Sequence, residues 1–105
     1  VVTTLSVSIP IIQSNIERHG LGHIVSKVRA SEIPVLELEK NTSLASKVVA
    51  KEALVAEQED GISAIVLGCA GMVEVVATVR SHLSSTVIDP VECAAQCMLW
   101  ITQKN

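Results

Sequence analysis

The sequence contains no phenylalanine and no tyrosine, and Trp100 is its only aromatic residue. The core must therefore be built from Val, Ile, Leu and Ala, which are typical of buried parallel strands and of the helices that cover them. No apolar run approaches the ~18–20 residues that a membrane-spanning helix needs, and the first residues lack the basic stretch and hydrophobic segment of a secretion signal. We expect a soluble protein with no membrane partner.

Positive charge is also scarce. Eight Lys and Arg residues stand against eleven Asp and Glu residues, which gives a formal net charge of −3 without any basic cluster. Nucleic-acid binding needs such a cluster, so we expect no nucleic-acid partner. The three cysteines are an odd number and lack the spacing of a disulfide framework. Free thiols are typical of a reducing compartment, and the expected localisation is cytoplasmic.

The first residues have the composition of a buried strand. Residues 1–5 read VVTTL, with no methionine ahead of them. The 105 residues suffice for one domain, although a domain of this size buries only about 60–70% of the surface of its unfolded chain. We expect a fragment of a longer protein, cut at the start of a strand.

Apolar periodicity predicts strands that alternate with helices. The expected strands cover residues 1–4, 23–28, 64–67 and 86–88, and the expected helices cover residues 9–19, 43–59, 72–83 and 90–105. Residues 30–40 are expected to form a loop with a short edge strand. This alternation predicts an α/β fold with a parallel sheet and right-handed crossovers, a flavodoxin-like three-layer sandwich.

Two of these segments carry a sharper expectation about burial. In the helix 43–59, Leu44, Val48 and Val55 recur at helical spacing and are expected to face the core. The run 64–67 is continuously apolar, which predicts a strand that is buried on both faces.

Cys69 is the candidate for chemistry. It follows the most buried expected strand and precedes a helix, at the edge of a parallel sheet where ligands bind. The positive end of the helix dipole favours a thiolate there, and the small residues Gly68, Ala70 and Gly71 would let a substrate approach the sulfur. The alternative is that Cys69 is a small buried apolar residue, as most free cysteines are.

Several motifs, taken in order, resemble one family. The letters AIVLGCAGM at 64–72, followed after one helix by VIDPV at 87–91, are similar to the second cysteine motif of hydantoin and allantoin racemases. Further matches to that branch are VVTTL at 1–5 with Pro10, VRA at 28–30 and IPV at 33–35. The resemblance covers nearly the whole chain. It identifies residues 1–105 as the C-terminal lobe of a two-lobe member of the aspartate/glutamate/hydantoin racemase superfamily.

The resemblance implies a cofactor-independent racemase or epimerase of small molecules, either hydantoin-like or amino-acid-like. Each lobe supplies one cysteine to opposite faces of the chiral carbon, and Cys69 would be the catalytic cysteine of this lobe. One thiolate removes the α-proton while the other thiol delivers a proton from the far side. The amides of Ala70 and Gly71 and the hydroxyls of Thr3 and Thr4 would bind the substrate and hold its carbanion or enediolate.

The first cysteine motif of the family is missing from this sequence. The expected partner is therefore the missing N-terminal lobe, which would supply the second cysteine. Cys93 and Cys97 cannot replace it because both lie in the middle of the last helix, where they form a second apolar stripe with Trp100. We expect the helix 90–105 to pack on the missing lobe, and the isolated chain to be inactive and to form a homo-oligomer.

Two other functions remain open. One is a decarboxylase of the same superfamily, in which a single cysteine protonates the product carbanion. The other is a non-catalytic, flavodoxin-like binding module in which Cys69 is structural. Alkylation of an activated Cys69 by iodoacetamide well below pH 8 would distinguish catalysis from a structural role.

A metal site is not expected. Cys93 and Cys97 with His19 and His23 could supply zinc ligands in number, but zinc sites place their cysteine pairs on turns, and Gly20 interrupts the helix between the histidines. Asp89, which precedes a proline at a helix start, is expected to cap that helix.

Overall fold

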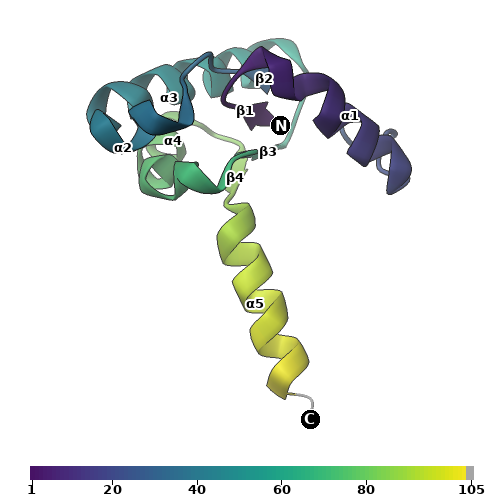
Figure 1. The fold of residues 1–105 in the computed structure, drawn as a ribbon. Helices are drawn as coiled ribbons and strands as arrows, with labels where there is room; N and C mark the ends of the chain where they lie inside the picture. The colour runs from purple at the N-terminus through teal and green to yellow at the C-terminus, as the bar shows by residue number, and fades with distance from the viewer. Residues whose placement is uncertain (104–105) are drawn as a thin grey trace.

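Four short parallel strands form the centre of the protein. The computed structural model describes residues 1–103, and its strands are β1 (Val2–Thr3), β2 (Arg29–Ala30), β3 (Ala64–Val66) and β4 (Thr86–Ile88). β1 pairs with β2, and β3 pairs with β4. A parallel bridge between Val2 and Leu67 joins the two pairs, so the strand order is β2-β1-β3-β4 (Figure 1). This is the order of a flavodoxin-like lobe, and the expected α/β fold with a parallel sheet is confirmed.

Helices connect the strands along the chain. They are η1 (Ser6–Ser8), α1 (Ile9–Arg18), α2 (Val35–Lys40), α3 (Thr42–Glu59), η2 (Ala70–Val75), α4 (Val76–His82) and α5 (Pro90–Gln103). The helices expected at 9–19 and 43–59 are confirmed with small shifts of their ends. The helix expected at 72–83 begins earlier, as the 3-10 helix η2, and continues as α4. Residues 104 and 105 of the expected last helix lie outside the described residues.

The core lies between the sheet and helices α3 and α4. Helix α3 contacts β1, β2 and α4. The buried residues of α3 are mostly alanines: Ala45, Ser46, Val49, Ala50, Ala53 and Ala56. Because these side chains are short, α3 lies close to the strands and to the buried Val76 and Val79 of α4.

The expected buried stripe of α3 was wrong. Leu44 is 54% exposed, and Val48 and Val55 are only partly buried. The larger side chains flank the alanine-rich face instead of forming it. The buried face of α3 is the face with small side chains, because these let the helix backbone approach the sheet closely.

Residues 23–28 do not form the expected strand. The chain turns at this point, with the amides of Ile24 and Val25 donating to the carbonyl of Leu21, and Ile24 is 68% exposed. The strand β2 begins only at Arg29, whose amide donates to Val1. Within the described residues β2 pairs only with β1, so the length of β1 sets the extent of β2. The alternation of apolar residues in 23–28 does not.

The segment 30–40 contains the helix α2 instead of a loop. Pro34 is the residue that precedes this helix; its backbone is extended, with φ −61° and ψ 147°, and it makes no side-chain capping hydrogen bond. Leu38 is the only fully buried residue of this helix. The alternation of Val35, Leu36 and Leu38 with glutamates led to the expectation of an edge strand. The segment is helical instead, because one buried leucine is enough to dock a helix of this length.

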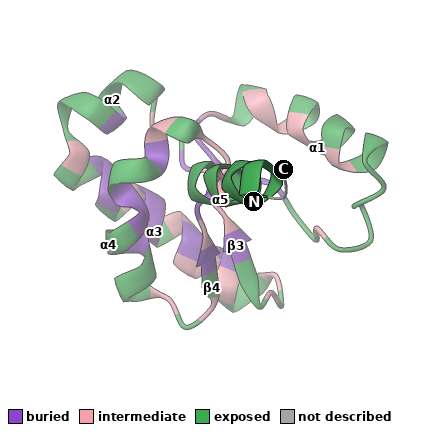
Figure 2. Cartoon of the chain, turned by 90° about the horizontal axis from the view of Figure 1, so that it is seen from below, coloured by how far each residue is buried: buried purple, intermediate pink, exposed green. Residues whose placement is uncertain are grey.

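One face of the sheet has little helical cover. Ile65 and Leu67 are buried, whereas Ala64 is exposed and Val66 is only partly buried, so the expected burial of 64–67 on both faces was wrong. Helix α5 points away from the sheet (Figure 1), and neither α1 nor α5 contributes a buried residue. Figure 2 shows the buried positions gathered on α3, α4 and the strands, with α5 exposed along its length. Within residues 1–103, no helix combines the length and the apolar character needed to cross a bilayer.

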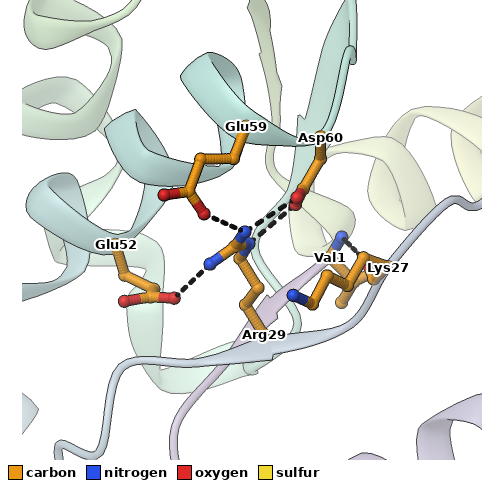
Figure 3. A network of polar contacts seen from close by, with 6 residues as sticks. All are labelled: Val1, Lys27, Arg29, Glu52, Glu59 and Asp60. Atoms are coloured by element: carbon orange, nitrogen blue, oxygen red, sulfur yellow. Dashed lines mark hydrogen bonds and ion pairs between the residues drawn. The ribbon is translucent and has the colours of Figure 1, made fainter.

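Arg29 ties the edge strand β2 to the end of α3 (Figure 3). Its guanidinium donates to both carboxylate oxygens of Asp60 at 2.7 Å, and to Glu52 and Glu59 at 3.2 and 3.0 Å. The side chains of Arg29 and Asp60 are each 10% exposed. Their hydrogen bonds lower the pKa of Asp60 and raise the pKa of Arg29. The carboxylates compensate the buried charge, and the network holds β2 in place beside β1, which carries Thr3.

Candidate functional site

Cys69 lies at a strand-to-helix turn, as expected. It follows β3 with an extended backbone, φ −146° and ψ 131°, and it is the residue that precedes η2. The amide of Met72 donates to its carbonyl at 3.0 Å, which closes the first 3-10 turn. The thiol is free and partly buried. The first helical turns after the cysteine are 3-10 and not α, because the α-helix starts only at Val76.

Gly68 and Gly71 lie on either side of Cys69 in the sequence, and at both positions neighbouring atoms leave little room for a Cβ atom. A Cβ on Gly68 would lie 2.8 Å from Cγ1 of Val1, and a Cβ on Gly71 would lie 3.2 Å from Cδ1 of Leu38 and 3.6 Å from Sγ of Cys69. Gly68 thus lets the end of β3 lie against β1, and Gly71 lets α2 pack against the turn. Close approach, and not an unusual backbone angle, requires these glycines.

Thr3 and Thr4 lie at the carboxyl end of β1, next to this turn. Both are buried, and Cβ of Thr3 would be 3.6 Å from a Cβ on Gly68. Neither hydroxyl makes a hydrogen bond within residues 1–103, and no polar side-chain atom there is both sealed from solvent and unpartnered. The two residues are only 2% and 6% exposed, and neither is among the residues that line the cleft containing Cys69. The structure brings Thr3 beside the Cys69 turn, with Thr4 following it.

Sequence reasoning missed the two residues that hold this threonine pair. The Ser31 hydroxyl donates to the carbonyls of Thr3 and Thr4 at 3.1 and 3.3 Å. The Glu32 amide donates to Thr4 at 2.7 Å, and its carboxylate accepts the amide of Ser6 at 3.0 Å. Glu32 has φ +63°, a conformation that costs energy for a residue other than glycine. Nothing in the sequence signals that angle, since glutamate rarely adopts it.

The Cys69 turn opens on a cleft of about 450 Å³ between β3 and the first turns of α5. Its lining residues are Val66, Gly68, Cys69, Ala70, Pro90, Val91 and Ala94. Apart from the thiol, every side chain in this lining is apolar. Cys69 lines this cleft, and its side chain also packs against the hydrophobic core; that the sulfur itself faces the open cleft stays a prediction.

Helix α5 begins at a well-defined cap. The Asp89 carboxylate accepts the amides of Val91 and Glu92 at 3.0 and 3.4 Å, which confirms Asp89 as a helix cap. Arg80 donates to the carbonyl of Val87 at 3.2 Å and pairs with Glu92 at 3.6 Å. The hydrogen bond from Arg80 joins α4 to β4, and the exposed ion pair with Glu92 adds a weak link to the first turn of α5.

Cys93 and Cys97 lie away from the Cys69 cleft. Both are exposed on α5 and line a separate groove with Arg80 and the edge of β4. Within residues 1–103, no three His, Cys, Asp or Glu side chains come together as a potential metal site.

Comparison with known sequences places the chain in a family of racemases. Residues 1–98 match the family described as Asp/Glu/Hydantoin racemase. The hydantoin racemase of Rhizobium meliloti is 41% identical over 96 residues, which are 91% of this chain and 40% of that protein. The hydantoin racemase of Paenarthrobacter aurescens is 32% identical over 81 residues, which are 77% of this chain and 34% of that protein.

Solved structures agree with the sequence relatives. The crystal structure of allantoin racemase from Pseudomonas fluorescens superimposes on 97% of this chain with a TM-score of 0.91 and 32% identity, and the match covers 43% of that chain. Allantoin racemase from Klebsiella pneumoniae has a TM-score of 0.90 over 97% of this chain and 42% of its own. The chain thus spans about 40% of the length of the relatives that it matches. With 98 residues matched, the chain belongs to the Asp/Glu/hydantoin racemase family.

Proposed function

We propose that this chain is one lobe of a cofactor-independent racemase or epimerase of hydantoin-like or amino-acid-like substrates, with Cys69 as its acid/base residue. One observation carries the proposal. The partly buried Cys69 stands at the carboxyl edge of the sheet and is one of the residues that line a cleft of about 450 Å³, with Thr3 packed beside the same turn. A cleft at this edge is where parallel sheets bind small molecules.

Racemisation requires a proton to leave one face of the chiral carbon and another proton to reach the opposite face. The Cys69 thiolate takes the α-proton of one enantiomer, and the electron pair of the broken C–H bond moves into the adjacent carbonyl to give an enolate. A thiol from the N-terminal lobe then donates its proton to the other face of the same carbon. For the opposite enantiomer the two sulfurs exchange roles, so the reaction needs no net proton source.

The enolate oxygen needs hydrogen-bond donors. The amides of Ala70 and Gly71 are the first of η2, so the helix itself offers them no carbonyl. The unpartnered hydroxyls of Thr3 and Thr4 are the other candidates. Donors that are held by strands and a helix start need little rearrangement during the reaction, which is how such groups stabilise a developing negative charge.

The apolar surface of α5 is the proposed docking site for the N-terminal lobe. Met98, Leu99, Trp100 and Ile101 are each at least half exposed. Cys93 and Cys97 extend this surface along the helix. Contiguous apolar patches are rare on soluble monomers, so in the absence of that lobe we propose that two or more copies of the chain associate through α5. Free thiols and the absence of paired cysteines support a cytoplasmic location.

The proposal is tested by placing this chain in the racemase of Rhizobium meliloti, in exchange for the matching segment. We expect the chimera to racemise a 5-substituted hydantoin, and Cys69→Ser to lower the rate by about 10²-fold or more. Cys93→Ser is the matched control and should lower the rate far less, because Cys93 lies on the proposed docking surface and not in the cleft that Cys69 lines. Undiminished racemisation by the Cys69→Ser chimera would refute the role of Cys69. Release of carbon dioxide from α-carboxylated carbon acids by the chain alone would favour the decarboxylase, which needs only one proton donor.

A further inference from the structure

One face of the sheet carries an apolar groove that remains largely open in the described part of the chain. Val66 and Ile88 are partners in the register of β3 and β4, and both are only partly buried. They lie on the face opposite to the core residues Ile65 and Val87, because successive side chains of a strand point to opposite faces. Both line a cavity of about 320 Å³ together with Ile24, which belongs to the turn before β2.

This cavity continues into the cleft at the carboxyl edge of the sheet. Val66 lines both the 320 Å³ cavity and the cleft of about 450 Å³, so the two meet at this residue. We call them together the sheet groove, which runs from the turn at residues 24–27 across β3 and β4 to the turn that holds Cys69. Lys27 is the only charged side chain that lines it. The sheet groove is therefore a long, mainly apolar surface.

Helix α5 has an apolar stripe that its own chain does not bury. Val91, Ala94, Met98 and Ile101 are spaced at i, i+3, i+7 and i+10, which places them on one side of the helix. No described residue of α5 is buried, and Met98 and Ile101 are 60% and 50% exposed. The helix begins two residues after the end of β4 and points away from the sheet (Figure 1). Val91 and Ala94 line the end of their own groove, whereas Met98 and Ile101 lie beyond it.

We propose that α5 of one copy of this chain lies in the sheet groove of a second copy, and that the exchange is reciprocal. This proposal rests on the association through α5 that belongs to the proposed function, and it names the surface that receives the helix. One chain carries both an apolar helix stripe and an apolar groove, but holds them apart. A two-fold axis lets each copy fill the groove of the other with the same contacts.

The buried area favours this exchange over direct pairing of two α5 helices. The four exposed or half-exposed residues of the stripe present on the order of 300 Å² on one helix. Pairing of two helices would bury two such surfaces, roughly 600 Å², which is less than stable complexes bury. The reciprocal exchange buries both stripes and both grooves, roughly 1,200 Å², which reaches the range of stable interfaces.

Charge favours one direction of α5 in the groove. Helices that cover a parallel sheet run antiparallel to its strands, which places the C-terminal end of α5 at the amino edge of the other copy's sheet. Lys27 lies at that edge, just before β2, and is exposed. Its ammonium would meet the carbonyls of the last helical turn, which have no partners within the helix and form the negative end of its dipole. Glu92, the only charged residue of Pro90–Gln103, would lie at the opposite end.

Cross-linking between copies tests the proposal. Two variants are mixed, each in a Cys69→Ala/Cys93→Ala/Cys97→Ala background: Ile24→Cys places a thiol in the groove, and Ile101→Cys places one near the end of α5. One variant is isotopically labelled, and mass spectrometry identifies the chains that a short bismaleimide joins. We expect mixed pairs, with one chain of each variant, at several times the yield of pairs between identical chains.

Leu36→Cys is the matched control for Ile24→Cys. Leu36 is 66% exposed and Ile24 is 68% exposed, but Leu36 lies on α2 and does not line the groove. Mixed with Ile101→Cys, the Leu36→Cys chain should give only background cross-linking. Equal yields from Leu36→Cys and Ile24→Cys would overturn the proposal. A predominance of pairs between two Ile101→Cys chains would also overturn it, because α5 would then pair with α5.

Sedimentation velocity gives an independent measurement without any cross-linker. Ile24→Asp should raise the dissociation constant of the dimer by about tenfold or more, because α5 of the other copy would cover the new charge. Leu36→Asp should leave the constant unchanged, and circular dichroism checks that both variants fold. A dimer that is unaffected by Ile24→Asp would contradict the proposal.

These experiments use no substrate, so they separate the possible failures. A chimera with the Rhizobium meliloti racemase that does not racemise would refute the proposed function, while cross-linking would still decide where α5 lies. A chimera that racemises, together with an absence of mixed cross-linked pairs, would refute only the exchange of α5.

Discussion

The amide of Gly68 donates a 2.7 Å hydrogen bond to the carbonyl of Val2, and this bond brings the two sides of the candidate site together. Thr3 follows Val2 on β1, and Cys69 follows Gly68 after β3. Because the strands are parallel, both residues lie at the same edge of the sheet. Together with the parallel bridge between Val2 and Leu67, this bond brings the threonines near the cysteine although they are far apart in the sequence.

The close approach of these strands gives a prediction about stability. A Cβ at position 68 would lie 2.8 Å from Cγ1 of Val1 and 3.4 Å from the carbonyl oxygen of Val2. Gly68→Ala should therefore lower the free energy of unfolding by about 1–3 kcal/mol, because the crowded neighbours must move. Urea unfolding followed by circular dichroism measures this change. Gly22→Ala is the matched control, since the added Cβ would meet only Glu17 at 4.0 Å. Equal losses in the two variants would contradict the argument.

The ion pair between Arg29 and Asp60 predicts a pH dependence. Hydrogen bonding to Arg29 lowers the pKa of Asp60 in the folded state. A lowered carboxyl pKa contributes stability above the unfolded pKa of about 3.9, and this contribution is lost as the pH falls through the lower folded pKa. Asp60→Asn should therefore reduce the free energy of unfolding by about 2 kcal/mol at pH 7, the size of a charge-assisted hydrogen bond, and by less near pH 2.

Urea unfolding at both pH values measures the effect of Asp60→Asn. Glu59→Gln provides the control, because Glu59 is 64% exposed and its ion pair with Arg29 should contribute less than about 1 kcal/mol. A loss from Asp60→Asn that does not shrink as the pH falls would show that the charge of Asp60 is not what stabilises the fold.

The Cys69 turn could be predicted from sequence because its determinants are local. A short apolar run that ends in small residues and is followed by helical periodicity indicates a buried strand, a turn and a helix start. Asp89 was predictable for the same reason, since a cap depends on the residues next to it. The parallel sheet followed from the alternation of strand and helix patterns.

The features that sequence reasoning missed depend on distant parts of the chain. The extent of β2 is set by pairing with β1, and α2 docks through the single buried Leu38. The positive φ of Glu32 is held by hydrogen bonds to Thr4 and Ser6, residues far away in the sequence. Burial of the strand 64–67 was overestimated because the position of α5, which points away from the sheet, cannot be read from its own apolar stripe.

The exposed surface of α5 predicts self-association of the isolated chain. Leu99 is 52% exposed among other apolar residues of this helix. Sedimentation velocity at high concentration should therefore give a species larger than the 11.1 kDa monomer. Leu99→Asp should shift the population towards monomer, because association would bury the new charge. Gln96→Asp introduces the same side chain at an exposed polar position of α5 and is expected to have a smaller effect. A monomer at all concentrations would contradict the prediction.

The central claim is that Cys69 supplies one of two proton-transfer groups and that the second comes from another lobe. Each positioned acid or base typically contributes about 10²–10⁴-fold to the rate, and a chain with one of them can protonate only one face of the carbon. The most direct measurement is polarimetry on a 5-substituted hydantoin, first with the chain alone and then after addition of the rest of the Rhizobium meliloti racemase as a separate polypeptide. The account predicts no racemisation by the chain alone, activity on addition of the second polypeptide, and loss of that activity in Cys69→Ser. Robust racemisation by the 105-residue chain alone, abolished by Cys69→Ser, would contradict the two-lobe mechanism.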